Sequence, residues 1–216
     1  MESEDPRNDD QKDAQQKAQE EEAEGRWITF PDPAKDWRPF LRQWSEQYIA
    51  WHDPDREPAP SPEAVRQGWL GSAPAEPAEI SALEERLGLT LPRSLRTFLQ
   101  TTNGWPDTGF LPAIAKASEI GFMRDLDDTW IRVSRYFDEC EAFYWPGTTV
   151  LERSVQISVP KERSALFLDP EDVNDDGEWA AYIIERNVPD QGFETLFDLF
   201  ADFYVLFYDC RYPWDE

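Results

Sequence analysis

The sequence predicts an α+β fold, with an antiparallel-rich central sheet of about four to six strands and helices packed on one side of it. Three observations predict this class. Apolar residues recur at helical spacing before residue 100, and short apolar runs separated by turn residues follow between 148 and 185. A final stretch, residues 193–208, has a wide apolar face at helical spacing. Helices, then strands, then a closing helix are typical of α+β packing.

The first predicted helix lies between residues 27 and 51. Its large side chains recur three and four residues apart, on one face of a helix, at Trp37, Phe40, Leu41, Trp44, Tyr48 and Trp51. The helix is expected to end at His52, because Asp53 and Pro54 follow. Residues 53–62 contain four prolines and predict an extended linker.

Two further helices are predicted to form a helical hairpin. Pro77 suits the first turn of a helix, and Gly88 suits its left-handed cap. The second helix starts at Pro92 and ends at Asn103-Gly104, two residues that tolerate positive φ. The inward positions of the two helices are Ile80, Leu83, Leu87, Leu95, Phe98 and Leu99.

The second half of the chain changes its pattern. Residues 105–120 are loop-like, and residues 127–140 place Trp130, Val133 and Phe137 at helical spacing. Four runs rich in Val, Ile, Leu and aromatic residues then predict strands, at residues 148–151, 155–159, 165–169 and 179–185. Residues 193–208 predict the closing helix, buried against the sheet.

The charge is unusual: 45 acidic residues stand against 21 basic ones, a net charge of −24. The first 24 residues carry ten acids and three bases, so most of the surplus belongs to the remaining chain. Such a field repels nucleic acid and anionic membranes, and it attracts basic proteins. Solubility alone is an equally good explanation of the charge.

Composition also divides the chain into three parts. Residues 1–25 are expected to be a disordered acidic leader, because they have no aromatic or β-branched residue. Residues 26–66 are expected to be an N-terminal helical extension with its linker, and residues 67–216 to be the main domain. No targeting signal or membrane span is recognisable, and Cys140 and Cys210 are interpreted as reduced core thiols, so we expect a cytoplasmic protein.

Several segments, taken in order, resemble the SUKH superfamily. They are PAEPAEISALEERLG at 74–88, LPRSLRTFL at 91–99, TNGW at 102–105, LFLDP at 166–170 and GEW at 177–179, followed by the aromatic helix. The residues that carry the resemblance are structural: Ile80, Leu83, Leu87, Gly88, Leu91, Pro92, Phe98, Leu99, Asn103, Gly104, Trp105 and Trp179. Leu95 stands where the family has an aromatic residue, which affects packing rather than function.

The resemblance implies a SUKH-like α+β fold and a function in binding. Many bacterial members of the superfamily are immunity proteins that block toxins, often nucleases or deaminases, and fungal members regulate cell-wall synthesis through partner proteins. The superfamily shares no catalytic residues. We therefore expect a non-catalytic protein without a cofactor that neutralises a basic cognate toxin. The alternative is a regulatory scaffold without a toxin partner.

Two acidic clusters are candidates for partner binding. Residues 169–178 hold six acids and are predicted to form a β-hairpin loop, with a turn at 174–177. Part of this loop resembles a calcium-binding loop, but Ile183 occupies the position that needs a bidentate glutamate. The candidate contact residues of the loop are Asp172, Asp175 and Asp176. The second cluster is Asp125, Asp127, Asp128, Glu139 and Glu141. The stronger interpretation of Asp127 and Asp128 is that they stabilise a helix N-terminus.

The remaining residues with chemical potential suggest no catalytic or metal site. His52 is the only histidine, and no partner for catalysis or metal binding is near it in sequence. Basic residues are scattered, which disfavours nucleic-acid binding. Among the tryptophans, Trp44 and Trp179 are expected in the core, whereas Trp145 and Trp214 are candidates for exposure, with Trp145 as a partner contact.

Overall fold

The structure is a computed structural model that describes residues 31–126, 128–139, 147–160, 164–185 and 188–212. Asp32–Glu216 form one compact unit. Its sheet has five antiparallel strands in the order β1-β2-β3-β4-β5. The strands are β1 (Gly121–Phe122), β2 (Val155–Gln156), β3 (Ser164–Val173), β4 (Trp179–Glu185) and β5 (Val188–Phe193). The predicted α+β class is confirmed.

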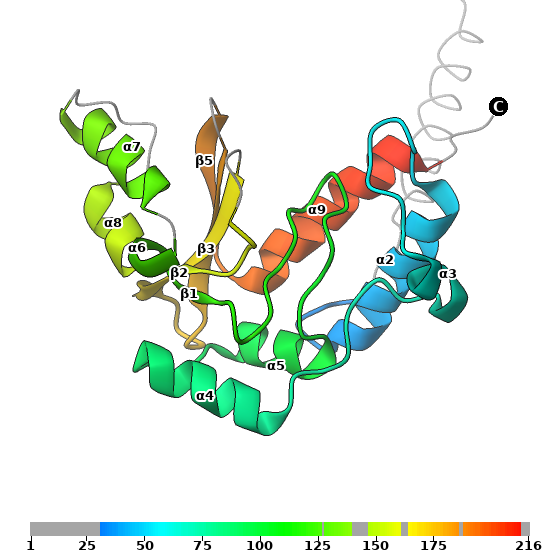
Figure 1. Ribbon diagram of the computed structural model, residues 1–216, viewed down its shortest axis with the longest axis horizontal. Helices are drawn as coiled ribbons and strands as arrows, with labels where there is room; N and C mark the ends of the chain where they lie inside the picture. The colour runs from blue at the N-terminus through cyan, green and yellow to red at the C-terminus, as the bar shows by residue number, and fades with distance from the viewer. Residues whose placement is uncertain (1–30, 127, 140–146, 161–163, 186–187, 213–216) are drawn as a thin grey trace, which may run out of the picture. The chain divides into compact units, whose positions relative to one another are not determined.

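Eight helices occur among the described residues, and Figure 1 shows how they surround the sheet. They are α2 (Trp37–Trp51), α3 (Pro62–Gln67), α4 (Pro77–Leu87), α5 (Arg93–Thr101), α6 (Met123–Leu126), α7 (Thr129–Glu139), α8 (Thr148–Arg153) and α9 (Leu196–Arg211). The helices predicted between residues 27 and 51, from Pro77 to Gly88 and from Pro92 to Asn103 are present as α2, α4 and α5.

The sheet is covered on both faces, so the prediction that helices lie on one side is wrong. Phe167 and Ile184 pack in one cluster with Trp130 of α7, together with residues of α6 and α8. The alternate residues of β3, Leu166 and Leu168, are also fully buried. Figure 1 shows α6, α7 and α8 on one side of the sheet and α9 on the other. A strand buried on both faces reads as a continuous apolar run rather than an alternating one.

The main core forms where α2 meets α5 and α9. Trp37 is 2% exposed, and its ring lies 5.3 Å from that of Phe98, 5.0 Å from Phe197 and 4.9 Å from Phe200. Trp44 is fully buried, as predicted. Each aromatic ring buries a large apolar area, so this cluster is a major source of stability. Helix α2 is therefore part of the same core as the segment after residue 67.

The helical hairpin α4–α5 follows its capping residues closely. Pro77 occupies the first turn of α4, and the carboxylate of Glu79 accepts from the backbone N–H of Glu76 at 2.8 Å. Gly88 ends the helix with φ 67°, a left-handed conformation that glycine adopts without steric cost. Most of the motif side chains are buried, including Ile80, Leu83, Leu87, Leu91, Phe98, Leu99, Trp105 and Trp179.

Residues 148–151 were predicted as a strand, and this prediction is wrong, because they begin helix α8. The β-branched residues Thr148, Thr149 and Val150 favour a strand by local propensity. Tertiary packing overrides that preference, since one helical turn places Leu151, which is fully buried, in the cluster on the sheet. At the other end of this turn, Asp138 accepts from the backbone N–H of Thr148 at 3.0 Å.

The closing helix and one cysteine also differ from prediction. Phe193 belongs to β5, and α9 begins at Leu196 after Thr195, whose hydroxyl accepts from the N–H of Asp198 at 3.2 Å. Cys210 is exposed rather than a core thiol, because it lies on the outward side of the last turn of α9. Cys140 lies outside the described residues.

Candidate partner-binding surface

The turn that joins β3 and β4 is held by Asn174. Its side-chain oxygen accepts from the backbone N–H groups of Asp176 at 3.1 Å and Glu178 at 3.0 Å. Gly177 completes the turn with φ 77°. The predicted hairpin turn at 174–177 is therefore present, and Asp175 and Asp176 are exposed at its tip.

The base of this hairpin is fixed to helix α5. Glu178 is 5% exposed, and its two carboxylate oxygens accept from the backbone N–H of Ser94 at 3.0 and 3.1 Å. A carboxylate is stabilised at a helix N-terminus, where backbone N–H groups are unpaired. The contact spans 84 positions of sequence, so it holds the hairpin in place relative to the helical half of the fold.

A second contact fixes the hairpin to helix α8. Arg153 donates from Nε to Asp169 at 2.8 Å and from Nη2 to the other carboxylate oxygen at 2.6 Å, and Nη1 meets Glu171 at 2.6 Å. The side chain of Asp169 is only 2% exposed. This bidentate arrangement is the strongest geometry for an arginine–carboxylate pair, and it raises the pKa of Arg153 through the hydrogen bonds to Asp169.

The six acids of residues 169–178 therefore divide into two groups. Asp169, Glu171 and Glu178 are partnered by Arg153 or by the α5 N-terminus. Asp175 and Asp176 have no cation within salt-bridge distance among the described residues, and Asp172 accepts only from the hydroxyl of Tyr182, at 2.7 Å. Asp172, Asp175 and Asp176, which the sequence singled out, are therefore the acids of this segment that form no ion pair with a described residue and do not bind the α5 N-terminus.

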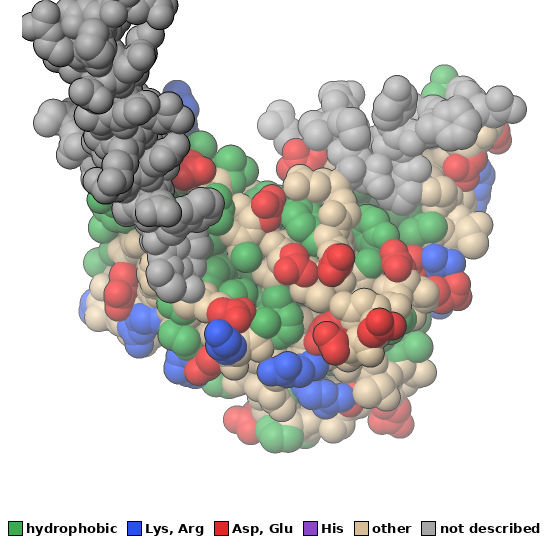
Figure 2. All heavy atoms as spheres, turned by 180° about the vertical axis from the view of Figure 1, so that it is seen from behind, with side chains coloured by type: hydrophobic (Ala, Val, Ile, Leu, Met, Phe, Trp, Pro, Cys, Tyr) green, Lys and Arg blue, Asp and Glu red, His purple; other side chains and the backbone are tan. Residues whose placement is uncertain are grey.

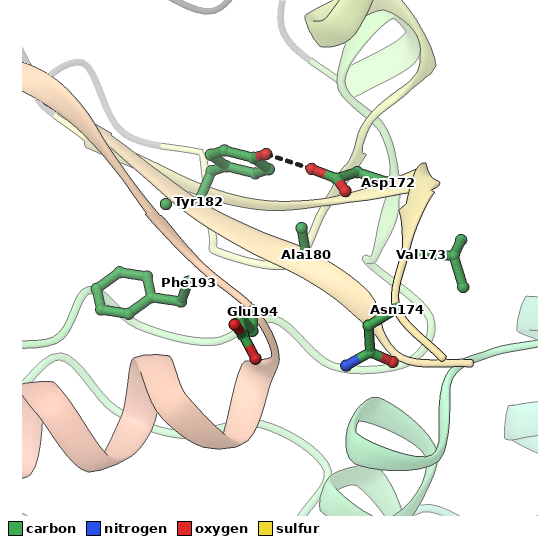
Figure 3. A pocket seen from close by; sticks show the side chains of 8 residues that line it. Asp172, Val173, Asn174, Ala180, Tyr182, Phe193 and Glu194 are labelled. Carbon is green, nitrogen blue, oxygen red and sulfur yellow. Dashed lines mark hydrogen bonds between the residues drawn. The ribbon is translucent and has the colours of Figure 1, made fainter. Parts of the chain in front are cut away.

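An open groove of about 400 Å³ lies beside the hairpin, along strands β3, β4 and β5 (Figure 3). We define it by its lining residues, which are Asp172, Val173, Asn174, Ala180, Tyr182, Gly192, Phe193 and Glu194. The ring of Tyr182 stacks on Phe167 with centroids 5.3 Å apart. The groove therefore combines an apolar floor with carboxylates at its rim.

The second acidic cluster does not reach this groove. Asp125 is exposed on α6, Asp128 is exposed just before α7, and Glu139 is exposed at the end of α7. Asp128 forms an exposed ion pair with Arg132 at 3.6 Å. Asp127, Glu141, Trp145 and Trp214 lie outside the described residues. None of the described members of this cluster lines the groove, so the structure does not bring the two acidic clusters together there.

Tyr182, Gly192 and Glu194 were not predicted from the sequence as residues of the site. Tyr182 lies opposite Gly192 on the neighbouring strand, and a side chain at Gly192 would come within 2.9 Å of the Tyr182 ring. A glycine inside a strand often marks such a close approach, so Gly192 could have indicated that a large side chain packs against this strand. It was not used because residues 188–193 were not recognised as a strand.

The charge around the groove is strongly one-sided. Residues 164–210 contain 12 acidic residues and one basic residue, Arg186. Figure 2 shows acidic side chains spread over the middle of one face, with Lys and Arg mostly along its lower part and its edges. Arg86 lies in α4, and Arg93 and Arg96 lie in α5. A cationic partner would therefore be oriented toward the sheet and α9.

Two negative findings concern the described part of the chain. No group of three or more His, Cys, Asp or Glu residues there is placed to hold a metal ion. None of the helices that the structure describes is long and apolar enough to cross a membrane.

Comparison with family models gives a match to the SMI1/KNR4 family (SUKH-1) over residues 74–206. This is more than half of the chain. The chain belongs to the SMI1/KNR4 family. The SUKH-1 match begins just before α4, ends within α9 and includes the whole hairpin and the groove. Helix α2 precedes the SUKH-1 match, although it packs into the same core. A search of curated proteins found no match to this chain.

Proposed function

We propose that this protein is an immunity protein, which binds a basic cognate toxin in the cytoplasm and neutralises it without chemistry of its own. The observation that carries the proposal is the division of charge on the β3–β4 hairpin. Three acids fix the hairpin to α5 and α8, and three others, Asp172, Asp175 and Asp176, present their carboxylates outward.

A fixed hairpin is suited to tight binding. A flexible loop must lose conformational entropy when it binds, at about 0.5–1.5 kcal/mol for each immobilised side chain. The contacts of Glu178 with Ser94 and of Arg153 with Asp169 restrain the hairpin before binding, which lowers the part of this cost that comes from ordering the loop. The exposed carboxylates are therefore already positioned to accept charge-assisted hydrogen bonds from Lys or Arg.

The proposed mechanism is steric and electrostatic. The acidic surface covers the basic substrate cleft of the toxin and replaces the negative charge of a nucleic-acid substrate. The net charge of −24 speeds the encounter with a cationic protein, and this effect weakens as salt screens it. Membership of the SMI1/KNR4 family supports the proposal, since the bacterial proteins that the sequence resembles include immunity proteins.

Co-expression with the product of the neighbouring gene tests this function. The proposal predicts that the two proteins co-purify, that high salt weakens the complex, and that this chain restores growth to cells that express the neighbouring product. Absence of a complex together with absence of rescue would overturn it. A reverse-charge variant, in which Asp172, Asp175 and Asp176 are all replaced by lysine, is expected neither to co-purify with the neighbouring product nor to restore growth.

A further inference from the structure

We propose that the groove beside the hairpin receives one arginine side chain of the protein partner, between the carboxylates of Asp172 and Glu194. This inference deepens the proposed function and rests on it for the identity of the partner as a basic protein. It goes beyond that function in naming the residue type that the groove selects.

The groove is open, and its volume of about 400 Å³ leaves room for a long side chain. Ala180 and Gly192 form part of the lining, and any side chain at Gly192 would meet Tyr182 at 2.9 Å. Val173, also in the lining, is 47% exposed. Arginine has an apolar three-carbon stem that gains from contact with such surfaces while its charged head stays hydrated.

Two carboxylates lie on different sides of this floor. Figure 3 shows Asp172 and Glu194 on opposite sides of Ala180, at the ends of β3 and β5. Among the residues that the structure describes, no Lys or Arg lines the groove. A guanidinium carries five N–H donors in a planar fork and can serve two acceptors at once, whereas the lysine ammonium is a compact point charge. The groove therefore favours arginine over lysine.

Tyr182 is a positioning residue for this site. Its hydroxyl donates to Oδ2 of Asp172 at 2.7 Å, and its ring is held by stacking on Phe167. The hydrogen bond occupies Oδ2 and restrains the carboxylate of Asp172 at the rim of the groove. Loss of the hydroxyl is expected to leave the groove in place and to weaken its hold on the guanidinium.

The test is an NMR titration of the full chain with two short neutral-capped peptides, Gly-Arg-Gly and Gly-Lys-Gly. We expect the arginine peptide to shift the amide signals of Ala180 and Gly192, and to bind about threefold or more tightly than the lysine peptide. Asp172→Asn and Glu194→Gln are each expected to weaken binding of the arginine peptide about fivefold. Tyr182→Phe should weaken it about twofold.

Glu85→Gln is the matched control, because Glu85 is exposed on α4 and its loss changes the net charge equally. It should change the affinity less than about twofold. Equal weakening by Glu85→Gln and Asp172→Asn, or equal affinity for both peptides, would overturn the inference and leave only attraction to the overall charge. Since the peptides need no partner, the result is independent of the co-purification experiment, and either proposal can fail alone.

Discussion

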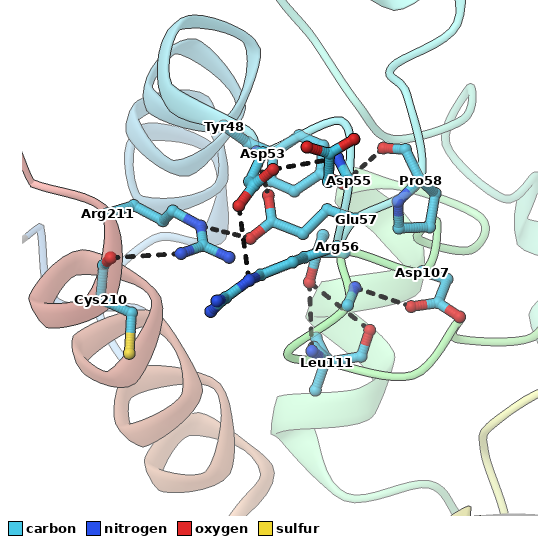
Figure 4. Close-up of polar contacts among 12 residues, drawn as sticks. Tyr48, Asp53, Asp55, Arg56, Glu57, Pro58, Asp107, Leu111, Cys210 and Arg211 are labelled. Carbon is cyan, nitrogen blue, oxygen red and sulfur yellow. Dashed lines mark hydrogen bonds and ion pairs between the residues drawn. The ribbon is translucent and has the colours of Figure 1, made fainter.

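Arg211, in the last turn of α9, donates from Nε to Oε1 of Glu57 at 2.5 Å, although the two residues are 154 positions apart. Glu57 also accepts from the backbone N–H of Asp53 at 3.1 Å, and the Arg211 guanidinium lies 5.3 Å from the centre of the Phe110 ring. Figure 4 shows Arg211, Glu57 and Asp53 lying together at the end of α9. Neither Glu57 nor Arg211 lies within residues 74–206, so the ion pair joins the segment before the family match to the segment after it.

Glu57→Gln is expected to destabilise the protein by about 3 kcal/mol, because it leaves the Arg211 charge without its counter-ion in a site where the Arg211 side chain is only 15% exposed. Urea unfolding measures the change. The control is Glu63→Gln, which removes a carboxylate from an exposed pair with Arg66 and is expected to cost less than about 1 kcal/mol. Equal effects of the two variants would contradict the structural role of the Glu57–Arg211 pair.

Trp37→Ala is expected to cost about 3–5 kcal/mol, because it removes a ring that contacts Phe98, Phe197 and Phe200. Its indole N–H also donates to the carbonyl of Ser94 at 3.1 Å. Chemical denaturation measures the free energy of unfolding of this variant and so tests whether α2 belongs to the core. Val65→Ala is the control, since Val65 is 51% exposed. A loss below about 1 kcal/mol for Trp37→Ala would show that α2 is dispensable.

Gly192→Ala is expected to destabilise the fold by about 1–3 kcal/mol, because the new methyl group would displace the Tyr182 ring. Gly147→Ala provides the comparison: the nearest atom to its new methyl group is 3.8 Å away, so a small change is expected. The midpoint of thermal unfolding distinguishes the two. If both substitutions are equally mild, Tyr182 does not lie over Gly192 as described.

Alkaline pH is expected to unfold the protein between about pH 10 and 12. Burial raises the pKa of Tyr208 to about 12, and burial also raises the pKa values of Tyr48 and Tyr204 above their usual range. Each folded-state pKa lies above the unfolded value of about 10. The tyrosines therefore stabilise the fold fully below pH 10, and this contribution is lost as the pH rises through the folded pKa values.

Tyrosinate absorbance and circular dichroism, recorded on the same samples, test this prediction. The protein has seven tyrosines, and the part of the absorbance rise that belongs to these three should coincide with the loss of helical signal. Their ionisation near pH 10 in a protein that keeps its helical signal would contradict it.

The local signals in the sequence predicted the helices well. Pro77 and Gly88 bracket α4 as their backbone preferences require, and the aromatic stripe from Trp37 to Trp51 faces the core. Such positions are decided by residues near in sequence, through capping and periodicity. The same holds for the turn at 174–177, where Asn174 and Gly177 suffice.

The wrong predictions concern segments whose structure is decided by packing against residues distant in the sequence. Thr148 and Val150 are β-branched, which favours a strand. The segment is nevertheless helical, because one helical turn places Leu151 in the core cluster with residues of α7. The continuous apolar run at residues 165–168 was a signal that both faces of β3 are covered, but it does not identify which helices cover them. The division of the chain at residues 66 and 67 stays a prediction.

The candidate surface was only partly predictable. The acids of residues 169–178 were visible in the sequence, but the sequence did not show which of them have a partner. Asp169 is paired by Arg153, and Glu178 by the backbone N–H of Ser94, which is 84 positions away. The groove could not be predicted, because Tyr182, Gly192 and Glu194 meet only through the pairing of β4 with β5. The roles of Asp125, Asp128 and Glu139 in partner binding stay proposals.

The dissociation constant of the complex with the basic partner, measured for two triple variants, shows whether the exposed carboxylates of the hairpin bind that partner. One variant replaces Asp172, Asp175 and Asp176 by asparagine, and the other replaces Glu46, Glu63 and Glu85 by glutamine, so both lose three charges. The account predicts about 100-fold weaker binding for the first variant and less than about fivefold for the second. Equal weakening of the two variants would contradict it.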